Sequence, residues 1–211
     1  MWSSYRLARR TSTLFATRLA PKRMRHKYET RGLVLARAPV GEAHARLAIL
    51  TEDLGLVWAR AQGLRRSGGK LASSLVTFAE TDLVLVRGKE GWRITGAVLV
   101  KNWFTHLVEP DARRTASRVA GLALRLSPGE DAAVVLLPVM RSFLTALSCA
   151  TSTTRDGAEL VAVSHLLATL GLNEEDESLS VSFAPEQLAR VIGERHQYVA
   201  RINRGITASG L

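Results

Sequence analysis

Apolar and polar residues alternate in short runs between residues 28 and 103, and this pattern predicts a region built from β-strands. The first run covers residues 32–36, before Pro39 and Gly41, and the second covers residues 45–50. The third run, residues 56–62, follows a polar turn. Because side chains alternate between the two faces of a strand, the third run divides into two sets. One face carries Leu56, Trp58, Arg60 and Gln62, and the other carries Val57, Ala59 and Ala61.

A glycine-containing turn at residues 88–91 joins two further predicted strands, residues 78–86 and 92–101. In the last strand we expect Trp92, Ile94, Val98 and Val100 on the same face. Residues 70–75 lie between the third and fourth strands and are long enough for one helical turn. Five short strands with such an insert match the OB-fold, a small closed barrel that binds oligonucleotides. An SH3-like barrel has a similar strand count, so the count leaves both topologies open.

From about residue 104 the apolar residues recur with the period of a helix. Helices are predicted up to residue 126, over residues 131–149 and 155–170, and from Pro185 to Ile202. Pro138 marks a delayed start or a kink in the second helix, and Gly171 is the expected C′ residue of the third. The chain is therefore predicted to be α+β. It divides into a basic leader at 1–27, a barrel domain at 28–103 and a helical domain at 104–211.

The basic charge of the chain is concentrated at its start. The formal net charge is +10, but residues 1–23 contribute six basic side chains and no acidic one. The rest of the chain carries 23 basic and 19 acidic side chains, so it is only mildly basic. The leader has the composition of a targeting peptide or of a disordered basic arm. It could also be an over-called translation start, with the true start at Met24, and this is the interpretation that we favour.

The sequence contains few of the residue patterns on which enzymes and metal sites depend. It lacks the common phosphate-loop, nucleophile-elbow, zinc-protease and dinucleotide-binding motifs. The five histidines are scattered, and His165 is expected to lie in the core or at its edge rather than to bind a metal. The single cysteine, Cys149, excludes an intrachain disulfide and a multi-cysteine zinc site, and we expect a buried thiol. The longest apolar run is too short to span a bilayer. We therefore expect no catalytic activity, no metal, no cofactor and no membrane partner.

A basic, glycine-rich loop at residues 63–70 is the strongest candidate for binding. Its backbone N–H groups and cations can approach phosphates together. Four arginines on the neighbouring strands could extend this positive surface. The candidate phosphate-binding residues are Arg31, Arg37, Arg46, Arg60, Arg65, Arg66 and Lys70. Trp58 is either a stacking platform for a base or a core residue, and we favour the core; a loop that only solubilises the protein is the alternative for Arg65 and Arg66.

A second cationic feature lies on the first predicted helix. Arg114, Arg118 and Arg125 are spaced so that they fall on one side of that helix, beside its apolar stripe. They could clamp phosphates, or an acidic peptide whose apolar side chain enters the neighbouring groove. A solvated helix flank is an equally simple interpretation.

The order of these motifs resembles the bacterial RecO family of recombination mediators. The resemblance rests on residues 30–35, Gly41-Glu42, residues 50–55 and residues 61–66, and it continues through residues 71–86. In the helical half, Glu159-Leu160 through Leu170-Gly171-Leu172 resembles the family's helix that ends in Leu-Gly. The match is good over residues 28–103 and looser beyond them.

This resemblance implies an OB-fold that binds single- and double-stranded DNA, followed by a helical domain. Such proteins anneal complementary strands in the repair of DNA damage and, with RecR, help to load the recombinase. They also bind the acidic C-terminal tail of single-strand-binding protein, a role that Arg114, Arg118 and Arg125 could carry here. The resemblance implies a bacterial cytoplasmic, nucleoid-associated protein. This chain lacks the four-cysteine zinc module of many relatives, and its acidic segment at 173–182 lies near where that module would be inserted. A generic RNA-binding barrel and a protein-binding adaptor are the alternatives.

Overall fold

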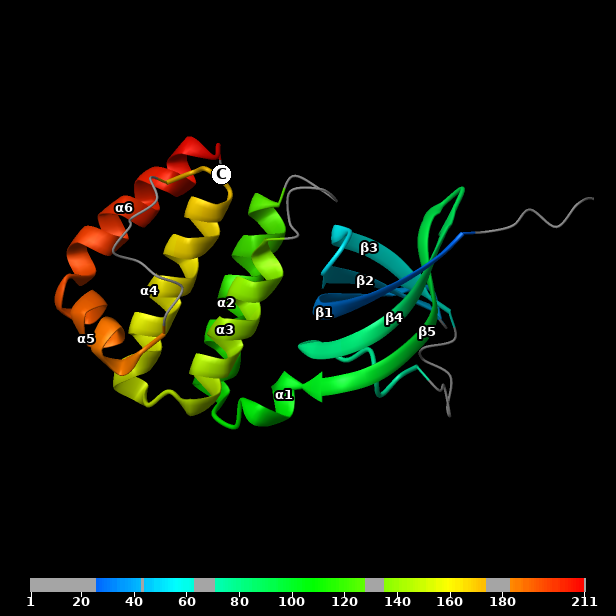
Figure 1. Ribbon diagram of the computed structural model, residues 1–211, viewed down its shortest axis with the longest axis horizontal. Helices are drawn as coiled ribbons and strands as arrows, with labels where there is room; N and C mark the ends of the chain where they lie inside the picture. Colours follow the sequence, from blue (N-terminus) through cyan, green and yellow to red (C-terminus); the bar gives the residue numbers. More distant parts are fainter. Residues whose placement is uncertain (1–25, 43, 63–70, 128–134, 174–182, 211) are drawn as a thin grey trace, which may run out of the picture.

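A computed structural model describes residues 26–42, 44–62, 71–127, 135–173 and 183–210. It consists of five strands followed by six helices, with the strands at one end of the molecule and the helices at the other (Figure 1). The strands are β1 (Lys27–Val40), β2 (His44–Thr51), β3 (Gly55–Ala61), β4 (Ala79–Gly88) and β5 (Gly91–Asn102). The helices are α1 (Trp103–His106), α2 (Pro110–Leu126), α3 (Leu136–Cys149), α4 (Ser152–Thr169), α5 (Pro185–Gly193) and α6 (Arg195–Ala208).

The strands close into a barrel in the order β1-β2-β3-β5-β4. The long first strand pairs antiparallel with β2 on one side and with β4 on the other. The barrel closes through a short parallel contact, in which Ala59–Ala61 of β3 pair with Trp92–Ile94 of β5. This arrangement confirms the predicted α+β class and the OB-fold. Strand β1 is longer than predicted, because Pro39 continues the ladder opposite Ala45 near the end of the β1–β2 hairpin.

Residues 71–78, which precede β4, form turns and bends without a regular helix. Leu75 is fully buried among the inward-facing side chains of the strands. Phe78 is buried with a φ of 62°, and its backbone N–H donates to the carbonyl of Val34 at 2.8 Å. The insert therefore fixes the start of β4 against β1.

The barrel has two apolar surfaces, one inside and one outside. The inner surface is closed by residues such as Val34, Ile49 and Leu85. The outer surface of β1, β2 and β3 contributes Leu33, Leu35, Ala48, Leu50 and Leu56 to the core of the helical half. Helix α2 contacts β1 and α3 contacts β2, and these two helices lie between the barrel and α4–α6 (Figure 1). The two halves thus share one continuous core.

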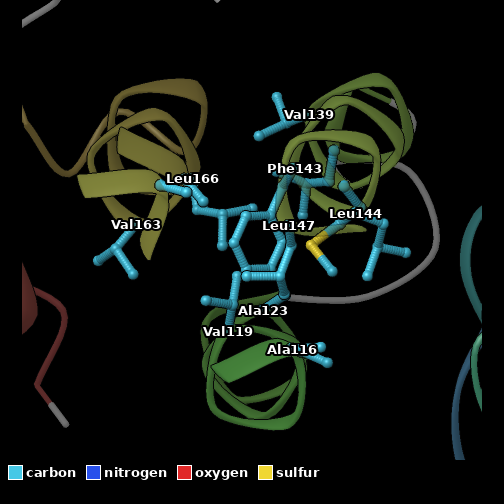
Figure 2. Close-up of a cluster of buried hydrophobic side chains, with 14 of the residues drawn as sticks. Ala116, Val119, Ala123, Val139, Phe143, Leu144, Leu147, Val163 and Leu166 are labelled. Atoms are coloured by element: carbon cyan, nitrogen blue, oxygen red, sulfur yellow. The ribbon is translucent and has the colours of Figure 1, made fainter. Parts of the chain in front are cut away.

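The helical core is built around Phe143 of α3. Its ring lies among side chains from α2, α3 and α4, including Val119, Ala123 and Leu166 (Figure 2). Phe143 is fully buried, and burial of an aromatic ring of this size removes much apolar surface from water. The buried His165 on α4 agrees with the prediction of a core histidine.

Four details of the helices differ from or sharpen the predictions. Pro138 lies in the first turn of α3, where its missing N–H is tolerated, so the delayed start is the correct alternative. Gly171 has a φ of 70° after α4, as expected for a C′ residue. The single helix predicted after Pro185 is wrong, because the chain breaks into α5 and α6 at Glu194. The predicted burial of Cys149 is also wrong; it lies exposed in the last turn of α3.

Ionic contacts also join the barrel to the helices. A guanidinium nitrogen of Arg141, on α3, lies 2.7 Å from Glu52 and 2.7 Å from Glu80. The side chain of Glu80 is 9% exposed, and its other carboxylate oxygen accepts a hydrogen bond from the indole N–H of Trp103 at 3.2 Å. This polar network holds α3 against the start of β4 and the β2–β3 turn.

Candidate nucleic-acid interface

The outer face of β3 carries the exposed aromatic and cationic residues of the barrel. Val57, Ala59 and Ala61 point inward and are fully buried, which confirms the predicted alternation along this strand. Trp58 points outward and is 42% exposed, so the prediction that it lies in the core is wrong. The interior is already filled by the alternate positions, and the helices cover the outer face only as far as Leu56 and Ala48.

Three arginines form a row across adjacent strands on the same outer face, which we call the arginine row. Arg46 of β2 pairs in register with Arg60 of β3, and Arg60 pairs in register with Arg93 of β5. Neighbouring strands lie about 4.8 Å apart, so the guanidinium groups can reach nearby points on one extended polyanion. Glu90 approaches Arg60 at 3.4 Å, but both side chains are well exposed, and such a pair is easily exchanged for another anion.

Arg46 also contacts Trp58 directly. Its guanidinium carbon lies 5.0 Å from the centroid of the Trp58 ring, which is a cation–π geometry. Arg46 and Trp58 are diagonal neighbours, because Arg46 pairs with Arg60 and Trp58 pairs with Ala48. The row therefore combines cations and one exposed aromatic face at a single site.

The turns at this end of the barrel are those that OB-folds use for binding. The β1–β2 turn at Gly41 lies next to the strand ends that carry Arg46, and the β4–β5 turn at Glu90 lies next to Arg93. In OB-folds the face of strands 2 and 3, together with the loops after strands 1 and 4, binds oligonucleotides. The arginine row thus occupies the part of that face which the helices leave open.

The other predicted strand arginines do not join the row. Arg37 is exposed, but it pairs in register with Leu47, whose side chain points into the barrel. Because paired residues share a face, Arg37 lies on the face of the β1–β2 hairpin opposite to Arg46. Arg31 donates hydrogen bonds to Asp82, at 2.8 Å and 3.3 Å, and these bonds lower the pKa of Asp82 despite some opposing desolvation. The groove around Arg31 is also lined by Glu29, Glu52 and Asp53. Arg65, Arg66 and Lys70 lie outside the described residues.

Arg93 is a member of the row that the sequence analysis did not identify. The alternation in β5 places Arg93 on the face of the strand that Trp92 does not occupy, and the structure agrees. Nothing in that pattern showed that β5 pairs with β3 at this point. The parallel contact that closes the barrel brings Arg93 beside Arg60, although the two are distant in the sequence. Only the strand order could have revealed this.

The second half of β5 also departs from the predicted alternation. Ladder irregularities interrupt the pairing with β4, one of them between Val84 and Leu85, opposite Thr95. Beyond it, Val98 is 67% exposed and Val100 is 44% exposed, whereas Trp92 and Ile94 are buried. A bulge of this kind shifts the alternation by one residue, so the predicted shared face of these four side chains is wrong.

The predicted helical cations separate in the structure. A groove of ≈ 330 Å³ between α2, α4 and α6 has an apolar floor, and Arg118 lines it. Glu159 accepts two hydrogen bonds from Arg118, at 2.7 Å and 2.6 Å, and raises the pKa of that guanidinium. Asp156 and Arg195 also line the groove, so its charges balance. Arg114, paired with Asp111 at 2.6 Å, and the exposed Arg125 are not among the lining residues.

In the ranges that the structure describes, no cluster of three or more histidine, cysteine, aspartate or glutamate side chains could hold a metal ion. Within the same ranges, none of the helices has both the length and the apolar character needed to cross a membrane.

Comparison with known proteins identifies the barrel. Residues 24–103 match the family described as "Recombination protein O N terminal". The chain is 30% identical over 122 residues to the DNA repair protein RecO of Dehalococcoides mccartyi, which covers 58% of this chain and 48% of that protein. It is 31% identical over 160 residues to the DNA repair protein RecO of Gloeobacter violaceus, covering 75% and 60% of the two chains. The chain thus spans about half the length of the first of these relatives, and its residues 24–103 match the N-terminal domain of the RecO family.

Proposed function

We propose that this chain is a mediator of DNA repair and homologous recombination. It binds single- and double-stranded DNA on the barrel, anneals complementary strands and, with RecR, assists recombinase loading at the bacterial nucleoid. The observation that carries this proposal is the arginine row beside Trp58, on the binding face of an OB-fold that matches the N-terminal domain of the RecO family. The names of the relatives support a role in DNA repair.

The proposed mechanism requires no catalytic side chain. Two complementary strands repel each other through their phosphates, so an annealing protein must neutralise both backbones while the bases stay free to pair. Arg46, Arg60 and Arg93 present their cations on three neighbouring β-strands of one outer face. A DNA strand bound there would keep its other side open to a complementary strand. The loop at residues 63–70 follows β3 in the sequence, and we include its Arg65, Arg66 and Lys70 in the proposed DNA-binding site.

The salt dependence of DNA binding tests the arginine row. Each phosphate contact to single-stranded DNA contributes about −0.7 to the slope of log K against log salt. Changing Arg46, Arg60 and Arg93 together to alanine should flatten that slope by up to about 2, measured by fluorescence anisotropy. The matched control changes Arg114, Arg125 and Arg204 to alanine, which removes the same charge from the helical half. Equal flattening in the two variants would show that only total charge matters and would exclude the row.

A separate variant tests the loop. Changing Arg65, Arg66 and Lys70 together to alanine should also flatten the slope of log K against log salt, by up to about 2. That is the contribution of about three phosphate contacts. An unchanged slope would remove the loop from the site and leave the arginine row as the DNA-binding surface.

The helical groove is the proposed site for the acidic C-terminal tail of single-strand-binding protein. Its floor includes Leu122, Leu160 and Ile202, which can hold an apolar terminal side chain, and Arg118 and Arg195 can contact carboxylates. Because Glu159 already occupies Arg118, an acidic peptide has to replace that carboxylate. Arg114 and Arg125 could contact only a peptide that extends beyond the groove.

One set of binding measurements separates this proposal from its two alternatives. Anisotropy is measured with single-stranded DNA, with RNA of the same sequence and with an acidic peptide that ends in Asp-Phe. A generic RNA-binding barrel would prefer RNA and would not accelerate annealing of DNA. A protein-binding adaptor would bind the peptide and hold either nucleic acid weakly. Tight binding of DNA together with faster annealing of complementary strands would support the mediator.

A further inference from the structure

Trp58 is a large aromatic residue in an unusual place. Of the tryptophans that the structure describes, Trp92 and Trp103 are buried, with exposed fractions of 5% and 4%, whereas Trp58 is 42% exposed. It projects from a regular strand whose inward positions are fully buried, so its orientation is fixed by the register of the sheet. Arginines lie on two sides of it, Arg46 across the strand pair and Arg60 two residues along β3. An exposed ring between cations is the arrangement with which proteins bind single-stranded nucleic acid.

We propose that Trp58 is a stacking platform for an unpaired base, and that it gives this face a preference for single-stranded over duplex DNA. The inference rests on the proposed function and deepens it, because it names the form of nucleic acid that the arginine row selects. Stacking is available to any base, since every base has a flat π-face, so the platform requires no particular sequence.

The position of Arg46 shows how the base reaches the ring. At 5.0 Å from the ring centroid, the guanidinium leaves no space for a base between itself and Trp58. A base that stacks on this face of the ring therefore takes the place of the guanidinium, and Arg46 moves aside to a phosphate of the same strand. The exchange replaces a weak exposed cation–π contact by a stack and a charge-assisted hydrogen bond. Arg60, on the same face, remains available to the next phosphate.

Duplex DNA cannot make this contact. Its bases are paired and stacked on one another, so only its phosphates reach the barrel, and the duplex uses the arginines without Trp58. The platform thus separates the two substrates by a single side chain. The same reasoning applies to a strand that lacks bases, which offers phosphates alone.

The test compares three probes of equal length on the full chain: a mixed-sequence single strand, a duplex and a single strand of abasic sites. Trp58→Ala should weaken binding of the single strand about 5- to 150-fold, the range measured for one stacked base. Binding of the duplex and of the abasic strand should change less than about twofold, and the salt slope should stay the same. Trp58→Phe, which keeps a flat ring, should restore most of the affinity for the single strand. Circular dichroism and thermal unfolding check that the variants fold.

A spectroscopic readout follows the platform directly. Stacking of a base on Trp58 should quench the tryptophan emission of the wild type when the single strand is added, and Trp58→Phe should lose that quenching. The duplex and the abasic strand should quench neither protein.

The outcomes separate the inference from the proposed function. If the wild type binds the single strand and Trp58→Ala binds it equally well, the platform is refuted and the arginine row stands. An equal loss on the abasic strand would also refute stacking, because it would show that Trp58 only positions Arg46. If the wild type binds none of the three probes, the proposed function fails, and the platform fails with it.

Discussion

Removing Arg141 should destabilise the chain more than removing any of its exposed arginines. The side chain of Arg141 is 28% exposed, and one of its nitrogens lies 2.7 Å from Glu80 and from Glu52. Arg141→Met keeps most of the aliphatic volume but leaves Glu80, which is 9% exposed, with the indole N–H of Trp103 as the partner that the structure shows.

The magnitude follows from the burial of the two carboxylates. Breaking a fully buried ion pair costs about 3–5 kcal/mol, and because water reaches Arg141 we expect about 2 kcal/mol from Glu80. Glu52 is 42% exposed and contributes about 0.5 kcal/mol at most. The free energy of unfolding should therefore fall by about 2–2.5 kcal/mol, which lowers the Tm of a chain of this size by about 4–10 °C.

Urea unfolding followed by circular dichroism measures this loss, and a double-mutant cycle assigns it. Glu80→Gln keeps an acceptor for Trp103, so the cycle of Arg141→Met with Glu80→Gln isolates the pair and should give a coupling of about 1–2 kcal/mol. The same cycle with Glu52→Gln should give about 0.5 kcal/mol or less. A loss below 0.5 kcal/mol for Arg141→Met, or equal coupling to both carboxylates, would refute the argument that burial of Glu80 sets the magnitude.

Three further predictions test other contacts. Glu159→Gln should free Arg118 and raise the affinity for an acidic peptide ending in Asp-Phe by up to about fivefold, whereas Arg118→Ala should lower it; a peptide indifferent to both changes binds elsewhere. Arg31→Met should raise the pKa of Asp82 toward its ordinary value of about 3.9, seen by NMR titration. Because the pKa of Asp82 is lowered in the folded state, the stability from this pair is complete above the unfolded pKa and is lost as the pH falls through the folded one. Gly32→Ala should cost about 1–3 kcal/mol, since a Cβ there would lie 2.7 Å from a methyl group of Ile49; Gly121→Ala, with open space around it on α2, should instead stabilise the chain by about 0.5–1 kcal/mol, both by urea unfolding.

The barrel could be predicted from sequence because its strands have clear local patterns. In β3 the alternation around Val57 and Ala59 gave the correct inward face, and the count of strands with an insert fitted an OB-fold, which the resemblance to the RecO family then favoured over an SH3-like barrel. Prediction failed where the result depended on pairing between strands or packing between helices. The bulge in β5 that exposes Val98 depends on the ladder with β4, and the break at Glu194 divides a helix whose apolar residues are in step on both sides.

The candidate site was predicted less completely, for the same physical reason. A period-two pattern shows which residues share a face but does not show which face the helices will cover. Trp58 was placed in the core because it is flanked by aliphatic residues, yet the helical core ends at Leu56 on that strand. Arg31 and Arg46 looked alike in the sequence, and only the fold showed that the first lies among carboxylates and the second beside Trp58.

The packing of the helices on the outer face of β2 and β3 limits the length of any bound strand. Ala48, Leu50 and Leu56 are covered, so among the described residues the open part of this face begins at Trp58 and includes the arginine row. A nucleic-acid strand that ran from Trp58 along β3 toward Leu56 would meet the helices and would have to turn away. If the chain binds DNA on this face as proposed, each molecule would therefore contact a short stretch of nucleic acid there. In the proposed annealing reaction, so short a contact would favour release of the paired product.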